Sequence, residues 1–137
     1  HIHQKKNPFL YHQSWYYPRS LNHQPILQAL SILKQHTNFA CFTKDSDSYT
    51  HTLCNIYNAE WLVHNDQILF RISANRFLRN MIRALVGTLI ALGTEKYSLN
   101  DFETILLSAD RKKAGFSAPP HGLYLTQILY PNHLFIL

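Results

Sequence analysis

The segment from residue 74 to residue 93, ANRFLRNMIRALVGTLIALG, restricts the possible folds more than any other stretch of this chain. At about 100° per residue, its large apolar side chains fall in one broad sector of a helix, and its cations and amides fall opposite. We therefore predict a helix over residues 76–92 that packs one face against a sheet and ends near Gly93. The apolar set is Leu78, Met81, Ile82, Leu85, Leu89 and Leu92, and the polar set is Arg76, Arg79, Asn80, Arg83 and Gly87.

The polar side of this predicted helix carries arginines with no acidic residue three or four positions away. Like charges on one face repel, and a solvated face usually interleaves acids. Gly87 is also unusual, because glycine within a helix costs about 1 kcal/mol relative to alanine. It would, however, let a ligand or another backbone segment approach closely. Two interpretations stay open: a solvated cationic face, or a site that binds phosphate or carboxylate.

The remaining patterns predict an α+β sandwich, in which an antiparallel sheet carries helices on one face. Alternating apolar residues indicate strands, and helical spacing with capping residues indicates helices. The expected elements are a strand or extended entry segment (9–18), a helix from Pro25, a strand or packed loop (38–42), a loop (44–50), a hairpin with a possible bulge (51–63 and 67–74), the helix 76–92, a helix capped by Ser98 or Asn100 (98–110) and a closing strand (121–131).

Composition narrows the class of protein further. The chain has 137 residues, of which 46% are hydrophobic, and this is enough for one domain with its own core. No apolar run is long enough for a membrane span, and the first residues do not resemble a signal peptide. The net charge of +5 favours an acidic partner such as nucleic acid, but only loosely. Cys41 and Cys54 are isolated, which fits a reduced cytoplasmic protein, and the histidines show no metal-ligand spacing.

Two motifs carry a resemblance to a known family. The segment 74–93, with its Phe-Leu, Met, Arg and Val-Gly pattern, resembles the C-terminal half of the TruA-type tRNA pseudouridine synthases, and so does DRKKAGFSAPPHGLYLTQILYP at 110–131. The hairpin and the aromatic segment before it are similar more weakly. The resemblance implies a cytoplasmic, homodimeric enzyme that isomerises uridine to pseudouridine in the anticodon stem-loop of tRNA, with no cofactor and no metal.

The resemblance also implies a second, related α/β half that holds the nucleophilic aspartate in a Gly-Arg-Thr-Asp motif. That motif is absent from residues 1–137, which begin with His1 and contain one methionine, Met81. We therefore expect residues 1–137 to be a C-terminal domain that lacks the nucleophile and is inactive alone. Two alternatives remain: a non-catalytic RNA-binding or dimerisation module on the same scaffold, and an unrelated α+β domain with a cationic helix.

The resemblance transfers two residue roles. Arg83 matches the arginine that pairs with the nucleophile, where a guanidinium keeps a carboxylate ionised and fixes its orientation. Leu123 matches the leucine that contacts the target base. Other cations and amides of the two motifs are expected to contact RNA phosphates, with ordinary solvation as the alternative. These candidate RNA-binding residues are Arg76, Arg79, Asn80, Lys112 and Lys113. One departure from the family pattern is His51, where an arginine is common.

Overall fold

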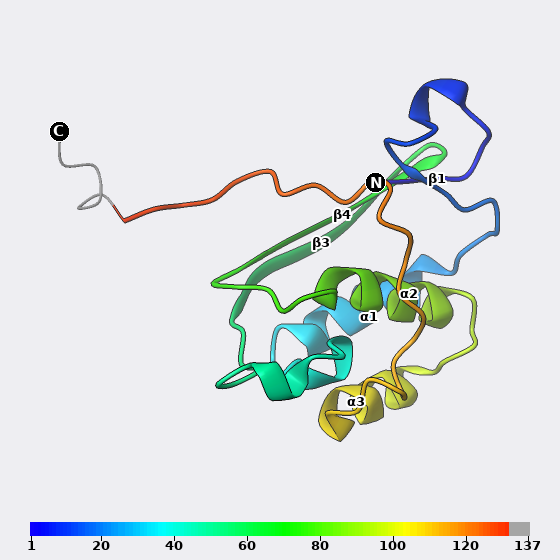
Figure 1. The fold of residues 1–137 in the computed structure, drawn as a ribbon. Coiled ribbons are helices and arrows are strands. Elements are labelled where there is room, and N and C mark those ends of the chain that lie inside the picture. The colour runs from blue at the N-terminus through cyan, green and yellow to red at the C-terminus, as the bar shows by residue number, and fades with distance from the viewer. Residues whose placement is uncertain (132–137) are drawn as a thin grey trace, which may run out of the picture.

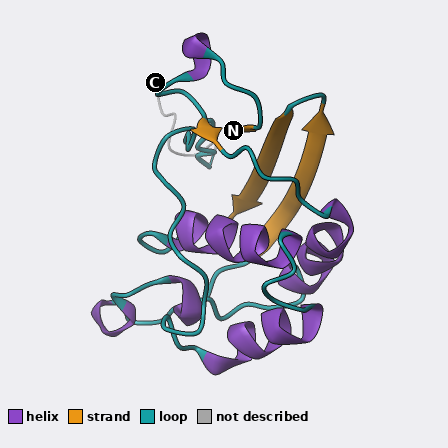
Figure 2. Ribbon diagram, turned by 90° about the vertical axis from the view of Figure 1, so that its right-hand side faces the viewer, coloured by secondary structure: helices purple, strands orange, loops and turns teal. Residues whose placement is uncertain are grey.

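A computed structural model describes residues 1–131, whose centre is a long β-hairpin lying against helices (Figure 1). The elements are β1 (Ile2–His3), a short 3-10 helix η1 (Pro8–Leu10), β2 (Trp15–Tyr16), α1 (His23–Leu33), η2 (Ala40–Phe42), η3 (Ser46–Ser48), β3 (Ile56–His64), β4 (Gln67–Ala74), α2 (Met81–Gly93) and α3 (Leu99–Ser108). Helix α1 contacts both β3 and α2, and α3 packs against α1 and α2, as Figures 1 and 2 show. The predicted α+β fold with helices on one side of a sheet is confirmed.

The sheet has four strands in the order β2-β1-β4-β3. The pairs β3–β4 and β1–β4 are antiparallel, and only the two-residue pair of β1 with β2 is parallel. The sheet is therefore mixed, which is a small correction to the purely antiparallel sheet expected. The predicted hairpin is confirmed, and its strand register shifts between Ile56 and Asn58, as the possible bulge would require.

The two faces of the hairpin differ as a half-buried antiparallel sheet requires. Trp61 pairs with Phe70 on the face toward the helices. The indole Nε1 of Trp61 donates a hydrogen bond to Nδ1 of His23, 3.1 Å away, and so ties the sheet to the start of α1. On the opposite face Arg71 pairs with Glu60 at 3.3 Å. The packed face of the sheet is therefore the one that α1 and α2 cover.

Helix α3 begins as predicted, because Ser98 caps it. The Ser98 hydroxyl accepts a hydrogen bond from the Asp101 N–H, and the Asp101 carboxylate accepts one from the Ser98 N–H. This reciprocal arrangement satisfies two backbone donors that a helix start leaves without partners. The helix expected from Pro25 is also present, starting slightly earlier at His23 with Asn22 as its cap.

Helix α2 corrects the prediction of a helix over residues 76–92. It begins only at Met81, because Asn80 adopts a left-handed conformation with φ 63° that interrupts a right-handed helix. Leu78 is nevertheless buried, with 3% of its surface exposed. Consequently Arg76 and Arg79 lie in the loop before α2 and do not share a helix face with Arg83. The second half of α2 is buried on all sides.

The strand or extended entry segment expected at 9–18 is partly confirmed, because this range includes the two-residue β2 but also the end of η1. The closing strand predicted at 121–131 is wrong, because these residues contain no strand. Gly122 and Tyr124 bond to the N-terminal segment, and the described chain beyond them runs away from the body of the molecule (Figure 1). Residues 38–42 form the packed turn η2 with a single bridge between Asn38 and Leu53. A strand pattern predicts extended backbone, but a strand forms only where a neighbouring strand can accept its hydrogen bonds.

Within residues 1–131, no helix is both long and apolar enough to cross a lipid bilayer.

Candidate functional site

Arg83 lies in the first turn of α2 and is half-buried. Its Nε–H donates a hydrogen bond to the carbonyl oxygen of Ala118 at 2.6 Å, and its own carbonyl accepts one from the Ala118 N–H at 2.9 Å. Among residues 1–131, ion pairs join Lys5 to Asp66, Arg71 to Glu60 and Arg79 to Asp45, and none involves Arg83. The positive charge of Arg83 therefore lacks an acidic partner within the described chain, and its two terminal nitrogens remain available.

The segment 114–118 lies along α2 because two glycines let the backbones meet. The carbonyl oxygen of Phe116 occupies the space that a side chain at Gly87 would need. At the next residue of α2, Oγ1 of Thr88 accepts a hydrogen bond from the Gly115 N–H at 2.9 Å, and a Cβ at Gly115 would lie 2.8 Å from the Thr88 Cα. The close approach expected at Gly87 is confirmed, and the group that approaches is the chain's own backbone.

A hydroxyl group beside Arg83 links three segments of the chain. Oγ of Ser117 accepts a hydrogen bond from Nδ2 of Asn80 at 2.7 Å and another from Nη2 of Arg111 at 2.9 Å. Arg111 also donates through Nη1 to the Gly115 carbonyl at 2.9 Å. From the sequence neither Arg111 nor Ser117 is a candidate site residue, although both lie within the 110–131 motif. Their proximity to Asn80 depends on tertiary structure, which local spacing does not reveal.

The remaining candidate RNA-binding residues lie in separate places. The Arg76 guanidinium carbon is 5.3 Å from the centroid of the Tyr49 ring, a cation–π contact. Nη1 of Arg79 lies 3.4 Å from Oδ2 of Asp45 at the exposed surface. Lys112 and Lys113 are exposed after α3. Asn80 and Arg83 thus bond to the neighbouring residues Ser117 and Ala118. Arg76 and Arg79 lie beside residues 45–49, and the two lysines lie elsewhere. Their contacts with RNA remain predictions.

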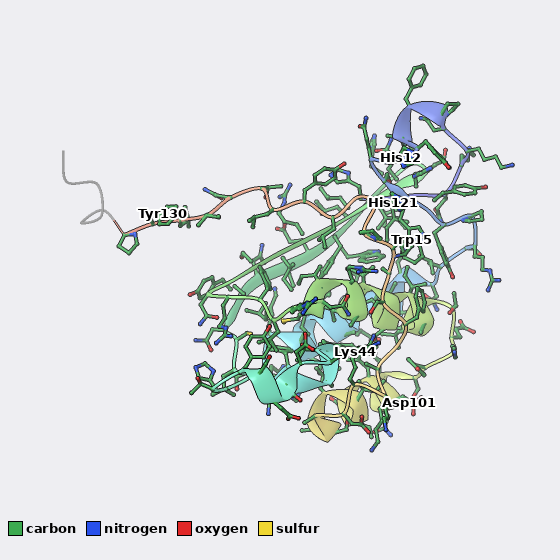
Figure 3. The ribbon with its side chains drawn as sticks, in the orientation of Figure 1. His12, Trp15, Lys44, Asp101, His121 and Tyr130 are labelled. Carbon is green, nitrogen blue, oxygen red and sulfur yellow. The ribbon has the colours of Figure 1, made fainter. Side chains whose placement is uncertain are left out.

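Leu123 is half exposed, in a turn that rests on the N-terminal segment. Its N–H donates to the Pro120 carbonyl at 3.2 Å, and 50% of its surface is exposed. Gly122 beside it has a φ of 86°, and its carbonyl accepts a hydrogen bond from the amino terminus at 2.8 Å. The rings of His12 and His121 are 5.6 Å apart, and Figure 3 shows Tyr130 far along the outgoing segment. The role of Leu123 at the target base remains a prediction.

Each of the five aspartates has a contact away from Arg83. Asp45 and Asp66 form ion pairs with Arg79 and Lys5. Asp47 accepts from the hydroxyl of Ser46, Asp101 belongs to the cap of α3, and Asp110 accepts from the Lys112 N–H at 2.9 Å. Among the described residues no three His, Cys, Asp or Glu side chains gather in a group that could hold a metal ion.

Comparisons with known proteins agree on one family. The family described as tRNA pseudouridine synthase matches residues 35–131. A protein named tRNA pseudouridine synthase A from Porphyromonas gingivalis is 40% identical over 135 residues, which cover 97% of this chain and 54% of that protein. Proteins of the same name from Parabacteroides distasonis and Gloeobacter violaceus are 36% and 35% identical, and the chain covers 52% and 42% of their lengths. The chain thus spans about half the length of the curated relatives it matches.

Proposed function

This chain belongs to the tRNA pseudouridine synthase family, and we propose that it is the C-terminal part of an enzyme that forms pseudouridine in the anticodon stem-loop of tRNA. The observation that carries the proposal is Arg83, a half-buried cation without an acidic partner among residues 1–131. It lies on the helix that carries the first family motif. We place the nucleophilic aspartate in a segment of a longer protein beyond these 137 residues.

Arg83 can accept an incoming carboxylate in only one of the two usual bidentate modes. A guanidinium binds a carboxylate either through Nε and one terminal nitrogen or through both terminal nitrogens. Because Nε of Arg83 donates to the Ala118 carbonyl, the aspartate meets Nη1 and Nη2 end-on. Two parallel hydrogen bonds from a cation lower the pKa of the carboxyl group and fix its rotamer. The lowered pKa keeps the nucleophile ionised, and the fixed rotamer holds it in one orientation.

The reaction breaks the bond from N1 of uracil to C1′ of the ribose and forms a bond from C5 to C1′. C5 loses its proton and N1 gains one, so the product is an isomer of uridine. Arg83 never accepts this proton, because an arginine stays protonated in proteins. Leu123 is proposed to contact the target base and to exclude water from it. Arg76, Arg79, Asn80, Lys112 and Lys113 are proposed to contact phosphates. The surface ion pair of Arg79 with Asp45 is weak enough for a phosphate to replace it.

We further propose that the longer protein works as a homodimer in the cytoplasm. The cytoplasmic assignment is supported by Cys41 and Cys54, which are both buried and free rather than joined in a disulfide.

The proposal is tested with the longer protein and unmodified tRNA. Arg83→Ala is expected to reduce turnover by at least a hundredfold and to leave tRNA binding nearly unchanged, because Arg83 pairs with the nucleophile rather than with phosphate. Arg19→Ala is the matched control, since Arg19 is exposed and only its carbonyl bonds to another residue, Gln4. Turnover near the wild-type rate in Arg83→Ala would remove Arg83 from the active site.

The same assay separates the enzyme from a non-catalytic module on this scaffold. Both bind tRNA through a basic surface, but only the enzyme converts uridine. A longer wild-type protein that binds tRNA and forms no pseudouridine would contradict the proposed function.

A further inference from the structure

The guanidinium of Arg83 is oriented by a single backbone group, the carbonyl of Ala118. An arginine side chain has several rotatable bonds, and an unrestrained one samples many rotamers. The hydrogen bond of 2.6 Å from Nε to this carbonyl selects one of them. The directions of Nη1 and Nη2 therefore depend on where the Ala118 carbonyl lies.

The residue before Ala118 is held from two sides. Ser117 accepts hydrogen bonds from Asn80, at the start of α2, and from Arg111, just after α3. A hydroxyl oxygen has two lone pairs, and these two donors use both. The second bond of Arg111, to the Gly115 carbonyl, holds the same segment two residues earlier. The position of the Ser117–Ala118 peptide is thus defined relative to both helices.

Asn80 departs from the usual behaviour of its position. An asparagine at a helix N-cap ordinarily uses its side-chain oxygen to accept a backbone N–H of the first turn. Asn80 makes no such capping bond, and its amide nitrogen reaches Ser117 instead. The side chain of Asn80 therefore forms a long-range hydrogen bond to Ser117 in place of the usual bond within the first turn.

The segment also contacts α2 at points that do not involve Ser117. Phe116 lies against Gly87, and Gly115 donates a hydrogen bond to Thr88. What the bonds to Ser117 add is the exact placement of the next peptide, whose carbonyl holds Arg83. A displacement of about 1 Å in a catalytic group can lower a rate a hundredfold.

We propose that Ser117, held by Asn80 and Arg111, is a positioning residue that orients Arg83 for the incoming carboxylate. This role rests on the function proposed above and extends it to residues that need not touch the reacting atoms.

The first test compares Ser117→Ala with Ser117→Thr in the longer protein. The alanine variant loses both bonds, so kcat is expected to fall roughly tenfold or more. KM for tRNA is expected to stay within about twofold, because four of the five proposed phosphate contacts do not bond to Ser117: Arg76, Arg79, Lys112 and Lys113. The threonine variant keeps the hydroxyl and is expected to recover most of kcat. Hydrogen exchange at the Ala118 N–H, which bonds to the Arg83 carbonyl, and the melting temperature report whether the segment stays docked.

The second test asks whether Ser117 acts through Arg83. In an Arg83→Lys background, where no Nε–H reaches the Ala118 carbonyl in the same way, Ser117→Ala is expected to cause little further loss. Arg111→Lys keeps the charge, loses the paired donors and gives the same test if Ser117→Ala fails to fold.

Wild-type kcat in Ser117→Ala, or an undiminished loss in the Arg83→Lys background, would show that the positioning role is wrong while the proposed function stands. An inactive longer wild-type protein would overturn the proposed function and this role with it.

Discussion

At the scale of single residues, the arginines that pair with acids at the surface differ from Arg83. Arg79 and Arg71 are exposed and pair with acids of this chain, and such surface pairs contribute little to stability. Arg83 is half-buried, bonded through Nε to a carbonyl, and left with its terminal donors unused within residues 1–131. Removing a cation from water without an acidic partner is unfavourable. The unfavourable placement is explained if a carboxylate arrives from outside the described residues.

Arg83→Lys tests this geometry at the residue scale. Lysine keeps the positive charge but offers a compact ammonium group instead of two parallel donors. In the longer protein we expect kcat to fall by at least tenfold, with tRNA binding unchanged, because the carboxylate keeps an attractive charge and loses its bidentate partner. Single-turnover rates with saturating enzyme measure the effect directly. An unaltered single-turnover rate would mean that charge alone is sufficient.

Cys41 gives a second prediction at this scale. Burial raises the pKa of the Cys41 thiol to about 12, and burial also raises the pKa of Cys54. The thiolate is the reactive form, so both thiols are expected to resist a disulfide reagent at pH 8 in the native chain. In denaturant both are expected to react at the rate of glutathione, the control thiol. Fast labelling of the native chain would show that the core around Cys41 opens readily.

At the scale of elements, the close packing of α2 against residues 114–118 depends on the absence of a side chain at Gly87. Gly87→Ala places a methyl group on the Phe116 carbonyl oxygen, so the segment must move. We expect a loss of about 2 kcal/mol in the free energy of unfolding, although alanine is the better helix former. Urea titration of the two proteins measures this difference in the free energy of unfolding.

Gly93→Ala is the matched control for this substitution. A Cβ at Gly93 would lie 2.7 Å from Cδ1 of Ile26, the end of a side chain, and no nearer than 3.3 Å to the backbone oxygen of Asn22. We expect the loss in unfolding free energy to be clearly smaller than that of Gly87→Ala. Equal losses would mean that the backbone contact with Phe116 is not the cause.

The cap of α3 gives a pH-dependent prediction. Hydrogen bonds from the Ser98 backbone and side chain lower the pKa of Asp101 below its ordinary value of 3.8. A carboxyl group with a lowered folded pKa contributes stability above its unfolded pKa, and this stability is lost as pH falls through the folded pKa. Asp101→Asn should therefore melt below the wild type at pH 6, and the difference should shrink as pH falls below about 3.8. A difference that stays constant with pH would contradict the charged cap.

The sequence predicts correctly those elements that depend only on residues close together in the chain. The hairpin and the Ser98 cap follow from alternation and from a Ser-x-x-Asp spacing. The start of α2 could not be predicted in this way, because Leu78 falls in the apolar sector and nothing nearby signals the left-handed Asn80. Residues 121–131 have the pattern of a strand, but no sequence pattern shows whether a partner strand lies within reach. The role of Arg111 could not be predicted for the same reason. Its partner Ser117 comes close to Asn80 only in the folded chain.

At the scale of the whole molecule, four of the five aspartates contact a cation or a backbone N–H group of the described chain. Asp45 and Asp66 neutralise neighbouring cations, and Asp101 and Asp110 hold backbone N–H groups near the two ends of α3. None of these aspartates pairs with Arg83. On the function proposed above, the carboxylate that pairs with Arg83 comes from a second segment of polypeptide, and the chain covers about half the length of each relative.

This division predicts that the 137-residue chain alone forms no pseudouridine. Bonding of C5 to C1′ releases the C5 hydrogen, so tRNA carrying tritium at C5 of uridine reports turnover as tritium in water. We expect the isolated chain to release no more tritium than an enzyme-free sample, and the longer protein to release it under the same conditions. A cooperative unfolding transition of the isolated chain would show that its inactivity does not come from misfolding. Release by the isolated chain above the blank would place the nucleophile among its own aspartates and would require one of them to leave its present partner for Arg83.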